Sequence, residues 1–573
     1  MKMTGAQIIL ECLAREGVEI VFGIPGGSTL PFYDAFRYYP QIRHILVKHE
    51  QSAAHAADAY ARVTGKVGVC CATSGPGATN LVTGIANAWM DSVPMVAITG
   101  QVVTWLIGRD GFQEADITGI TLPITKNNWL VLQAEDLALI VREAFYIART
   151  GRPGPVLIDV PRDVFIQEVE FEYPEELDLP GFKPTLEGHP AQIKKAAQLI
   201  AESERPLILA GHGVRISRAF DELRELAEKA QMPVITTLLG ISSFPGSHPL
   251  CMGMPGMHGM YWNNMAINEA DLLVAIGMRF DDRVTGALKD FAPHARIIHI
   301  DIDPAEIGKV VKPTVPIVGD VKRVLAALNP QVKKQRHDDW LAWLKKMREE
   351  HPSITIPDTD DLLPQYVIKK IYELSGNNGY VVTDVGQHQM WSAQYFWGDC
   401  PNAFISSGGL GPMGFAVPGA MGVQFAHPKE LVWAICGDGG FQMTMQELAC
   451  IVEHELPVKI AILNNSFLGM VRQWQEMFYG NRIFATREFG PDYVKLAEAF
   501  GLVGLRVTDK KQVEGAIERA LRHPGPVLID FQVSPDECVY PMVPPGASLS
   551  QTLDLPSVRE KVSARSKEVM VKS

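Results

Sequence analysis

The sequence has few cysteines, no excess of positive charge and no long apolar run. Its eight cysteines are scattered over 573 residues, and the adjacent pair Cys70 and Cys71 lies in an apolar stretch, so we expect buried, reduced thiols. The net charge of −12 argues against general nucleic-acid binding, which needs a basic surface. No apolar run reaches the length of a membrane span. The first residues, MKMTGAQIILECLAREGV, are typical of an amphipathic helix and not of a basic leader, so we expect a cytoplasmic protein.

Short apolar runs alternate with helical patterns along the chain. Continuous apolar strands between helices indicate parallel sheets that are covered on both faces. A chain of 573 residues is also too long for a single hydrophobic core. The sequence therefore predicts an α/β fold with several doubly wound parallel-sheet domains. The expected strands are KVGVCCAT (66–73), PMVAITG (94–100), GPVLIDV (154–160), RPLILAG (205–211), DLLVAIG (271–277), RIIHIDID (296–303), ELVWAICGDG (430–439), VKIAILNN (458–465) and GPVLIDF (525–531).

One internal repeat divides the chain. The segment AFYIARTGRPGPVLIDVPRD (144–163) is echoed by AIERALRHPGPVLIDFQVSPD (516–536), and in each a helix, a Pro-Gly-Pro turn and a buried strand follow one another. Two domains of similar plan are therefore expected to close near these segments. A third unit lies between two proline- and acid-rich stretches. The expected limits are 1–180, 190–345 and 362–545, followed by a C-terminal arm at 546–573.

Two strand ends carry side chains that suit a divalent cation. One apolar run ends at Gly437-Asp438-Gly439, and the next ends at Asn464-Asn465. Both turns of a parallel sheet emerge on the same edge, where α/β folds bind ligands. Carboxylate and amide oxygens suit Mg²⁺, and flanking glycines let the backbone approach a diphosphate closely. An ordinary turn at a strand end would also explain GDG taken alone.

Two further segments carry candidate site residues. Glu50 follows the strand-like run HILV and opens an alanine-rich helix, where favourable placement in the helix dipole is an equal alternative to a catalytic role. Gly386, Gln387 and His388 follow the strand YVVTDV and are suitably placed to contact phosphate. The loop GGLGPMG lacks the preceding strand and the downstream acid of a dinucleotide fingerprint.

Together these segments resemble the acetohydroxyacid synthase (acetolactate synthase) family of thiamine-diphosphate-dependent enzymes, whose catalytic large subunit the sequence matches from about residue 3 to residue 550. The resemblance is carried by GDG followed by NN, and by IPGGSTLPFYDA, TSGPGATNLVTGIANA, GFQE, GRPGPVLIDVPRDV, GMHG, FDDRVTG, GQHQMW, GMVRQWQ and YPMVPPGA. It implies the thiamine-diphosphate-binding fold, with an N-terminal pyrimidine-binding domain, a central FAD-binding domain and a C-terminal diphosphate-binding domain.

The resemblance also implies roles for single residues around thiamine diphosphate. Glu50 would bond the aminopyrimidine ring of a cofactor held by the partner subunit, the Gly411 carbonyl would receive that ring, and Met413 would keep the cofactor bent. A methionine is otherwise more often core filler. The whole implied set is Glu50, Gly386, Gln387, His388, Gly411, Met413, Gly437, Asp438, Gly439, Asn465 and Met470, with Asp438, Asn465 and the Phe467 carbonyl as ligands of Mg²⁺.

Substrate and flavin contacts are implied in the same way. The implied catalytic residues besides Glu50 are Gly27, Gln113 and Lys126, and the implied substrate residues are Arg283, Trp474, Met257 and Phe112. The arginine would pair with the carboxylate of the second ketoacid, and the tryptophan would favour the extra methyl of 2-ketobutyrate. The implied FAD residues are Arg152, Gly211, Gly213, Thr237, Leu238, His258, Gly277, Arg279, Asp281, Arg283, Asp301, Ile302, Asp320 and Val321.

The implied reaction is the decarboxylation of pyruvate and the ligation of its two-carbon unit to a second 2-ketoacid. Pyruvate as acceptor gives 2-acetolactate and 2-ketobutyrate gives 2-aceto-2-hydroxybutyrate, early steps of valine, leucine and isoleucine biosynthesis. A homodimer or homotetramer with active sites between subunits is implied, with a small regulatory subunit as a further expected partner. The alternatives are a catabolic acetolactate synthase, a pyruvate oxidase, a decarboxylase, or a cofactor-binding protein without catalysis. An NAD-dependent dehydrogenase is disfavoured because the sequence has no matching strand-GxGxxG-helix-acid unit.

Four positions depart from the family pattern. Val103 stands where the family commonly has proline, and His212 interrupts a usual triple glycine. Pro255 is unusual in its loop, and Gly440 replaces a small hydroxyl residue or alanine after GDG. None of them changes Glu50 or the two expected metal side chains.

Overall fold

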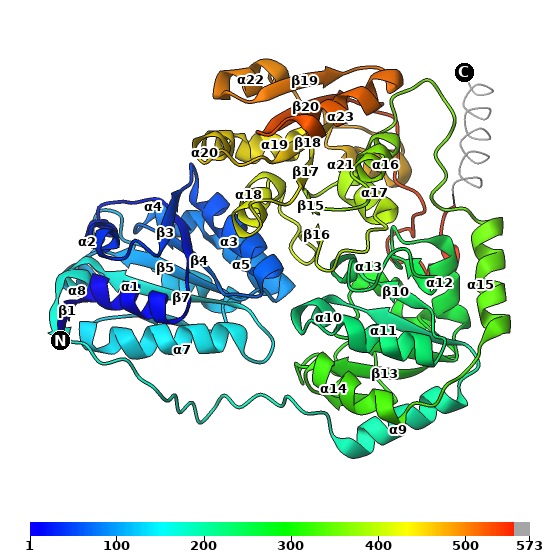
Figure 1. Cartoon of the computed structure of the whole chain (residues 1–573), viewed down its shortest axis with the longest axis horizontal. Coiled ribbons are helices and arrows are strands. Elements are labelled where there is room, and N and C mark those ends of the chain that lie inside the picture. Colours follow the sequence, from blue (N-terminus) through cyan, green and yellow to red (C-terminus); the bar gives the residue numbers. More distant parts are fainter. Residues whose placement is uncertain (555–573) are drawn as a thin grey trace.

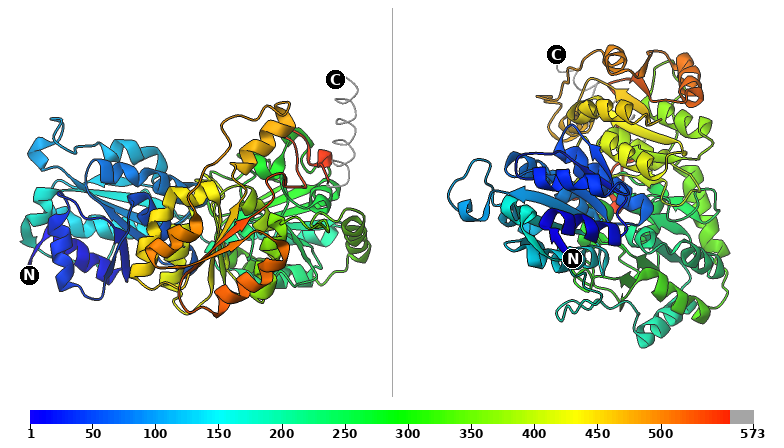
Figure 2. Two further views of the ribbon diagram at one scale, coloured as in Figure 1. Left: turned by 90° about the horizontal axis from the view of Figure 1, so that it is seen from above. Right: turned by 60° about the vertical axis from the view of Figure 1, so that its left-hand side comes forward.

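The computed structural model describes residues 1–554, and this part of the chain folds into three α/β units (Figure 1). Each unit is built on a six-stranded sheet, and all paired strands within these three sheets are parallel. The predicted fold class is therefore confirmed. Seen from above, the N-terminal unit lies to one side of the other two (Figure 2). The predicted C-terminal arm falls mostly outside the described residues.

The N-terminal unit holds the sheet β3-β2-β4-β5-β7-β6 and a short antiparallel pair, β1 (Lys2–Thr4) with β8 (Glu168–Glu170). Its central strands are buried on both faces, as their apolar runs predicted. The sheet strands are β2 (Ile20–Gly23), β3 (Arg43–Leu46), β4 (Gly68–Ala72), β5 (Met95–Gln101), β6 (Asn128–Leu130) and β7 (Pro155–Pro161). The helices are α1 (Gly5–Arg15), α2 (Leu30–Ala35), α3 (Glu50–Thr64), α4 (Pro76–Asn80), α5 (Val82–Asp91), α6 (Ile117–Thr121), α7 (Leu137–Arg149) and α8 (Arg162–Ile166).

The central unit holds the sheet β11-β10-β9-β12-β13-β14, and an extended segment, 171–189, connects it to the N-terminal unit along the lower edge of Figure 1. Its strands are β9 (Pro206–Ala210), β10 (Val234–Thr236), β11 (Cys251–Gly253), β12 (Leu272–Ile276), β13 (Arg296–Asp301) and β14 (Val315–Val318). Its helices are α9 (Pro190–Glu202), α10 (His212–Ile216), α11 (Phe220–Lys229), α12 (Tyr261–Glu269), α13 (Asp282–Thr285), α14 (Val321–Leu328) and α15 (Asp338–Glu350).

The C-terminal unit holds the sheet β16-β15-β17-β18-β20-β19. The two strands of the internal repeat, β7 and β20, each lie second from an edge of their sheet, so the repeat marks equivalent places in two similar units. The strands are β15 (Tyr380–Thr383), β16 (Phe404–Ile405), β17 (Val432–Gly437), β18 (Lys459–Asn464), β19 (Val503–Val507) and β20 (Val527–Gln532). The helices are α16 (Pro364–Leu374), α17 (Gln387–Tyr395), α18 (Ala416–Ala426), α19 (Asp438–Thr444), α20 (Leu448–Glu453), α21 (Gly469–Phe478), α22 (Tyr493–Phe500) and α23 (Val513–Arg522), with the 3₁₀ turn η8 (Met445–Glu447) between α19 and α20.

Each sheet has a reversal of strand order near its middle, and the candidate site segments follow the strands at these central reversals. The N-terminal and C-terminal sheets reverse a second time near one edge, where β7 lies inside β6 and β20 lies inside β19. The central reversal falls between β2 and β4 in the N-terminal unit, between β9 and β12 in the central unit, and between β15 and β17 in the C-terminal unit. Connections at such a point leave in opposite directions and open a crevice at the carboxyl ends of the strands. The fold therefore provides one crevice for a ligand in each unit.

Helices α3 and α18 join the N-terminal and C-terminal units. Their facing sides are made of small residues: a Cβ on Gly422 of α18 would lie 2.1 Å from the carbonyl oxygen of Ala56 on α3. Backbones can approach so closely only because both surfaces carry alanine and glycine. His55 of α3 also packs edge-on against Phe415, with ring centroids 5.3 Å apart. The two units are thus held in a fixed relation within one chain.

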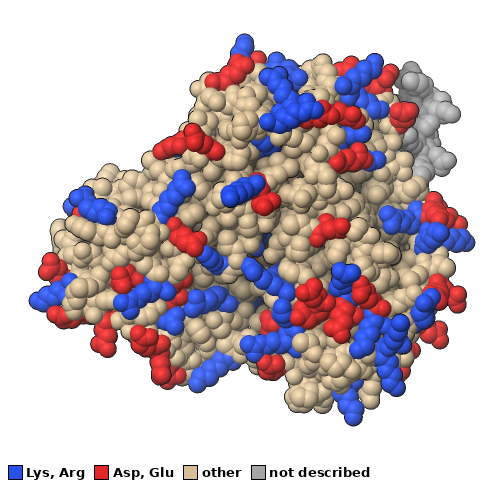
Figure 3. Space-filling model, viewed as in Figure 1, with Lys and Arg blue, Asp and Glu red and all other residues tan. Residues whose placement is uncertain are grey.

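No helix of the described residues is both long and apolar enough to cross a membrane. On the face shown in Figure 3, basic and acidic side chains are interspersed and form no extended patch of one sign.

Candidate functional site

The crevice of the C-terminal unit brings together most of the residues predicted to hold thiamine diphosphate and Mg²⁺. They come from the loops after β15, β16, β17 and β18 and from the start of α21. Of the predicted set, Gly386, Gln387, His388, Met413, Gly437, Asp438, Gly439, Asn465, Phe467 and Met470 line this cavity. Helices α17 and α19 both begin here, so their free amide groups face the cavity, as an anion would require.

Asp438 is a buried carboxylate, and no lysine, arginine or histidine of the described residues forms an ion pair with it. Burial raises its pKa to about 7, and the neighbouring carboxylate of Glu488 adds to that rise. Asn465 lies beside it in the cavity, with an amide oxygen that accepts the Phe467 N–H at 3.0 Å. A buried negative charge without a counter-ion, next to amide and carbonyl oxygens, fits a hard divalent cation.

Glycines and His388 shape the turn that carries this carboxylate. A Cβ on Gly386 or on Gly437 would lie 3.0 Å from the imidazole of His388, so the ring packs directly on both loops. The Gly437 N–H donates to Nε2 of His388 at 3.2 Å, and the Asp384 backbone accepts from the ring. Burial lowers the pKa of His388 to about 3, so the ring is neutral. His388 therefore fixes the turn around Asp438 with both ring nitrogens.

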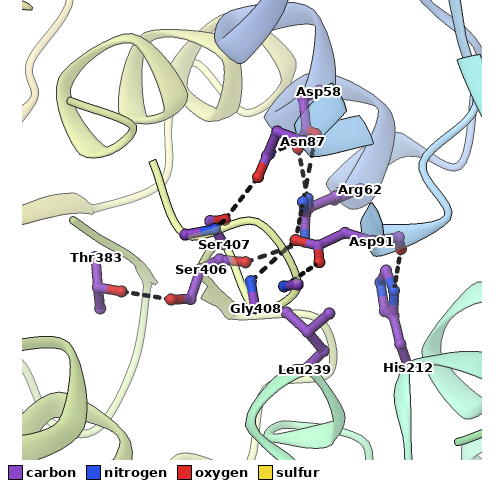
Figure 4. Close-up of polar contacts among 12 residues, drawn as sticks. Asp58, Arg62, Asn87, Asp91, His212, Leu239, Thr383, Ser406, Ser407 and Gly408 are labelled. Carbon is purple, nitrogen blue, oxygen red and sulfur yellow. Dashed lines mark hydrogen bonds and ion pairs between the residues drawn. The ribbon is translucent and has the colours of Figure 1, made fainter. Parts of the chain in front are cut away.

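The loop 406–414 crosses from the C-terminal unit to the N-terminal unit (Figure 4). Ser407 Oγ accepts the Gly411 N–H at 3.0 Å and donates to Oδ1 of Asn87 on α5 at 2.6 Å. Asn87 in turn donates to Asp58 of α3 at 3.1 Å. Gly411, which lies at φ +70°, is thus held through a serine and an asparagine by the helices of another unit.

A second set of contacts in Figure 4 holds the start of the same loop. The Asp91 carboxylate accepts the N–H groups of Gly408 at 3.0 Å and Gly409 at 2.7 Å. Arg62 pairs with Asp91 at 2.8 Å and with Asp58 at 2.5 Å. The carbonyl of Asp91 accepts a hydrogen bond from Nδ1 of His212 at 2.8 Å, so His212, one of the departures from the family pattern, ties the central unit to the N-terminal unit.

Residues of the N-terminal unit form a separate half of the candidate site. Glu50 is buried, and its carboxylate accepts a hydrogen bond from Asn80 Nδ2 at 2.9 Å. A Cβ on Gly77 would lie 3.2 Å from Glu50 Oε1, and one on Gly75 would lie 2.7 Å from the carbonyl oxygen of Gln113. Gly27 lies in the loop after β2, next to the reversal of strand order. Among the described residues, none of Gly27, Glu50 and Gln113 lines the crevice of the C-terminal unit.

A cavity of about 1140 Å³ lies where the three units meet. Its walls include residues 90–92 and 149–153 of the N-terminal unit, the loops after the strands of the central unit, and the loop 407–411. Of the predicted flavin set, Arg152, Gly213, Thr237, Leu238, His258, Gly277, Arg279, Asp281, Arg283, Asp301, Ile302, Asp320 and Val321 line it. Gly211 does not line it and instead packs on the next turn, where its Cβ would lie 2.4 Å from the Gly277 carbonyl oxygen.

This large cavity and the crevice of the C-terminal unit share a boundary. Met413, Met470 and Gly386 line both, and the predicted substrate residues Trp474 and Met257 line the large cavity near them. The Arg283 guanidinium lies over the Trp474 ring at 5.9 Å from its centroid. A cation and a flat apolar surface therefore meet at the junction, as binding of a small carboxylate requires.

Two predicted residues lie apart from these cavities. Lys126 donates to the carbonyl oxygens of Ile147 and of Thr150, the latter at 2.7 Å, at the end of α7. Burial lowers its pKa to about 7. Phe112 is 88% exposed and lines neither of the two cavities.

The sequence did not reveal the residues whose side chains hold the loops of the candidate site in place. Asp384 directly follows β15, and its carboxylate accepts the amides of Val385, Gly414 and Ala416. An aspartate directly after a predicted strand was a usable signal for it. Arg62, Asp91 and Ser407 gave no such signal, because their partners lie in other units.

Comparisons with known proteins agree with this arrangement. Three family models match: the N-terminal TPP binding domain of thiamine pyrophosphate enzymes at residues 3–120, the central domain at 193–328, and the C-terminal TPP binding domain at 384–531. The acetolactate synthase large subunit of Mycobacterium tuberculosis is 51% identical over 560 residues, which cover 96% of this chain and 91% of that protein. A probable acetolactate synthase large subunit of Methanocaldococcus jannaschii is 50% identical over 573 residues, with 98% and 97% covered.

The large subunit of acetolactate synthase from Corynebacterium glutamicum is 50% identical over 561 residues, with 96% of this chain and 90% of that protein covered. The predicted resemblance is therefore confirmed over nearly the whole chain. This chain belongs to the acetolactate synthase large-subunit family of thiamine pyrophosphate enzymes.

Proposed function

We propose that this chain is the catalytic subunit of a biosynthetic acetohydroxyacid synthase. It decarboxylates pyruvate and ligates the two-carbon unit to a second pyruvate or to 2-ketobutyrate, in the cytoplasm, for branched-chain amino-acid synthesis. The observation that carries the proposal is the buried, uncompensated carboxylate of Asp438 between two helix N-termini, in a chain about half identical to acetolactate synthases. A metal diphosphate matches both the charge and the amide groups of that crevice.

In this proposal Asp438, Asn465 and the Phe467 carbonyl hold Mg²⁺, which neutralises the diphosphate. Thiamine diphosphate, when bound, supplies an electron sink for the pair released by decarboxylation. Met413, on the wall shared by the two cavities, would pack against the bound cofactor, and the Gly411 carbonyl would accept a hydrogen bond from its aminopyrimidine ring. Glu50 holds a proton on that ring, while the apolar walls keep water away from the reacting carbon.

The large cavity suits FAD. Its volume of about 1140 Å³ exceeds what a small substrate needs, and a Cβ on Gly213 would lie 2.6 Å from the Cα of Gly277, so only glycine fits this close approach of two loops. Asp320 caps the N-terminus of α14, and Asp301 lies at the end of β13, where burial raises its pKa to about 6. Carboxylates at strand and helix ends suit ribose hydroxyls, and free helix amides suit the diphosphate.

The second ketoacid binds where the two cavities meet. Arg283 pairs with its carboxylate, and Trp474 and Met257 form the apolar pocket that accepts the extra methyl of 2-ketobutyrate. One methyl in such a pocket is worth about 1–3 kcal/mol. Gly27, Gln113, Lys126 and Phe112 contribute from the side of a partner subunit.

A homo-oligomer with active sites between subunits follows from the position of Glu50. Its carboxylate lies outside the crevice of its own chain, so it serves the crevice of a second copy. Large apolar side chains are exposed on both units that would meet: Phe112 and Trp105 on the N-terminal unit, and Phe484 and Phe489 on the C-terminal unit. Because the relatives are named large subunits, we also propose a small regulatory partner.

Product analysis tests the proposal. The purified chain is incubated with pyruvate, 2-ketobutyrate, thiamine diphosphate, Mg²⁺ and FAD, and we expect acetolactate and acetohydroxybutyrate. Omission of FAD abolishes both products, and Glu50→Gln lowers kcat at least about 100-fold. Glu498→Gln, which changes an exposed glutamate on α22, is the matched control and leaves the rate unchanged. Acetaldehyde or acetate without a ligated product would instead place the chain among the decarboxylases or oxidases.

A further inference from the structure

Glu447 is a buried glutamate that the proposed reaction does not use. It is wholly shielded from water and ends the turn η8, directly after the helix that begins at Asp438. Its carboxylate reaches across the interface between units and accepts the backbone N–H of Lys48, at 3.0 Å from Oε1 and 3.2 Å from Oε2. Burial raises its pKa to about 7, and the side chain of Ser52 and the amides of Lys48 and His49 partly offset that rise.

The segment that Glu447 holds is the turn just before Glu50. His49 caps α3, with its Nδ1 accepting the Gln51 N–H at 3.1 Å, and Glu50 is the first residue of the helix. The amide bound by Glu447 therefore lies two residues before the proposed acid. Glu50 has only Asn80 as a side-chain partner among the described residues, so the direction of its carboxylate depends mainly on where the helix begins.

Both carboxylate oxygens of Glu447 take part in this contact. The Lys48 ammonium group pairs with Glu453 of α20 at 3.2 Å, and its charge offsets only part of the rise in the pKa of Glu447. An amide side chain in place of Glu447 could present N–H groups to the N–H of Lys48, and only one oxygen would remain to accept. A carboxylate is thus the group that holds this turn in one position.

We propose that Glu447 is a positioning residue, which fixes the start of α3 so that Glu50 reaches the aminopyrimidine ring of the cofactor. This rests on the proposed function. The proposed role concerns the position of Glu50 and not the shape of the crevice. The segment η8 belongs to the same chain as Glu50, and none of its residues lines the crevice. The metal-binding side chain of one site and the positioning residue for the acid of another therefore lie at opposite ends of one short segment.

The test measures proton exchange at the thiazolium C2 of bound thiamine diphosphate. The holoenzyme with Mg²⁺ and FAD is mixed with deuterium oxide, quenched in acid and analysed by proton NMR. We expect Glu447→Gln to slow the exchange about 10- to 100-fold and to lower kcat in parallel, because a displacement of about 1 Å can cost that much. The Kd of thiamine diphosphate and the KM of pyruvate change less than about 3-fold, since the crevice itself is untouched.

Glu453→Gln is the matched control. It removes the ion pair between Glu453 of α20 and the Lys48 ammonium group, and it leaves the contact of Glu447 with the Lys48 backbone in place. We expect exchange at the wild-type rate. If Glu447→Gln does not fold, Glu447→Asp replaces it, since it keeps the charge and withdraws it by one methylene, and it too should slow the exchange. Wild-type exchange in whichever of these two variants folds overturns the inference.

The two proposals fail in different ways. If the wild-type protein binds no thiamine diphosphate, or if Glu50→Gln exchanges as fast as the wild type, the proposed function is wrong. If the wild type exchanges fast, Glu50→Gln slowly and the Glu447 variant fast, only the positioning role is wrong.

Discussion

Arg62 carries a positive charge into the interior, where its side chain and those of Asp58 and Asp91 are almost wholly shielded from water. Burial alone would lower the pKa of the guanidinium, but the two carboxylates outweigh it and raise that pKa, so the charge persists. The surplus negative charge is balanced by N–H groups, from Asn87 to Asp58 and from Gly408 to Asp91. Such a set is retained less for stability than for fixing one arrangement of its partners. Here the partners are the loops of the candidate site.

His55 allows a pH prediction at the scale of one residue. Burial, aided by the charge of Arg62, lowers its pKa to about 3, and its Nδ1 has no hydrogen-bond partner among the described residues. The neutral ring therefore contributes stability that is complete above pH 6.5, the ordinary histidine pKa, and is lost as the pH falls toward the folded value. We expect the free energy of unfolding of His55→Leu to rise relative to that of the wild type by about 1.4 kcal/mol for each pH unit below 6.5.

Thermal midpoints between pH 8 and pH 5 check this prediction. The gap between the two proteins should be constant from pH 8 to pH 7 and should then widen in favour of the variant. A gap that stays the same down to pH 5 would show that His55 already takes up a proton in the folded state.

At the scale of elements, the sequence predicted the inner strands better than the edge strands. All nine apolar runs named as strands form inner strands of the three sheets, from β4 to β20. Such strands are covered on both faces, so their sequences are continuously apolar. The edge strands β6, β11 and β16 have only two or three residues each, and strands of that length are too short to leave a comparable pattern.

The candidate site shows the same division. Asp438, Asn465 and the glycines around them lie at strand ends, so their meeting follows from local pattern and sheet topology alone. The acceptors that orient the loops could not be predicted, because Asp91, Ser407 and Glu447 acquire their partners only when separate units pack together. Lys126 is a case of the opposite kind. The resemblance implied a catalytic role for it, whereas in this chain its ammonium group donates to a carbonyl at the end of α7.

The loop 406–414 gives a prediction at this scale. Ser407→Ala removes the acceptor of the Gly411 N–H and the donor to Asn87, and each group left unpaired in the interior costs about 1–3 kcal/mol. Because Gly411 is proposed to orient the cofactor, we expect the Kd of thiamine diphosphate to rise about 5- to 10-fold, equivalent to about 1 kcal/mol. Titration calorimetry with the FAD-loaded protein measures it.

Ser203→Ala is the control for this variant, since its buried hydroxyl donates only to the Ile200 carbonyl within the central unit. It should leave the Kd unchanged. Equal Kd values for the wild type and Ser407→Ala would mean that the loop keeps its position without the serine.

At the scale of the whole molecule, the three units together enclose the large cavity, whereas Glu50, the proposed acid, does not line the crevice around Asp438. The cavity has walls from all three units, but the crevice around Asp438 is lined by the C-terminal unit alone. Packing of α3 on α18 holds the N-terminal unit of the same chain in place, so Glu50 cannot swing into that crevice without breaking a closely packed interface. In the proposed homo-oligomer, each chain would therefore carry two half-sites that belong to different complete sites.

This division predicts that two inactive variants restore activity together. Glu50→Gln lacks the acid and Asp438→Asn lacks the metal carboxylate, so each alone should be inactive. When the two chains carry different affinity tags and the mixed dimer is purified by both, one of its sites contains both defects and the other contains neither. We expect the mixed dimer to show about half of the wild-type specific activity.

A mixed dimer of two differently tagged Glu50→Gln chains is the control and should remain inactive. If instead each site were built within one chain, every site of the mixed dimer would carry one defect, and its activity would not exceed that of the single variants.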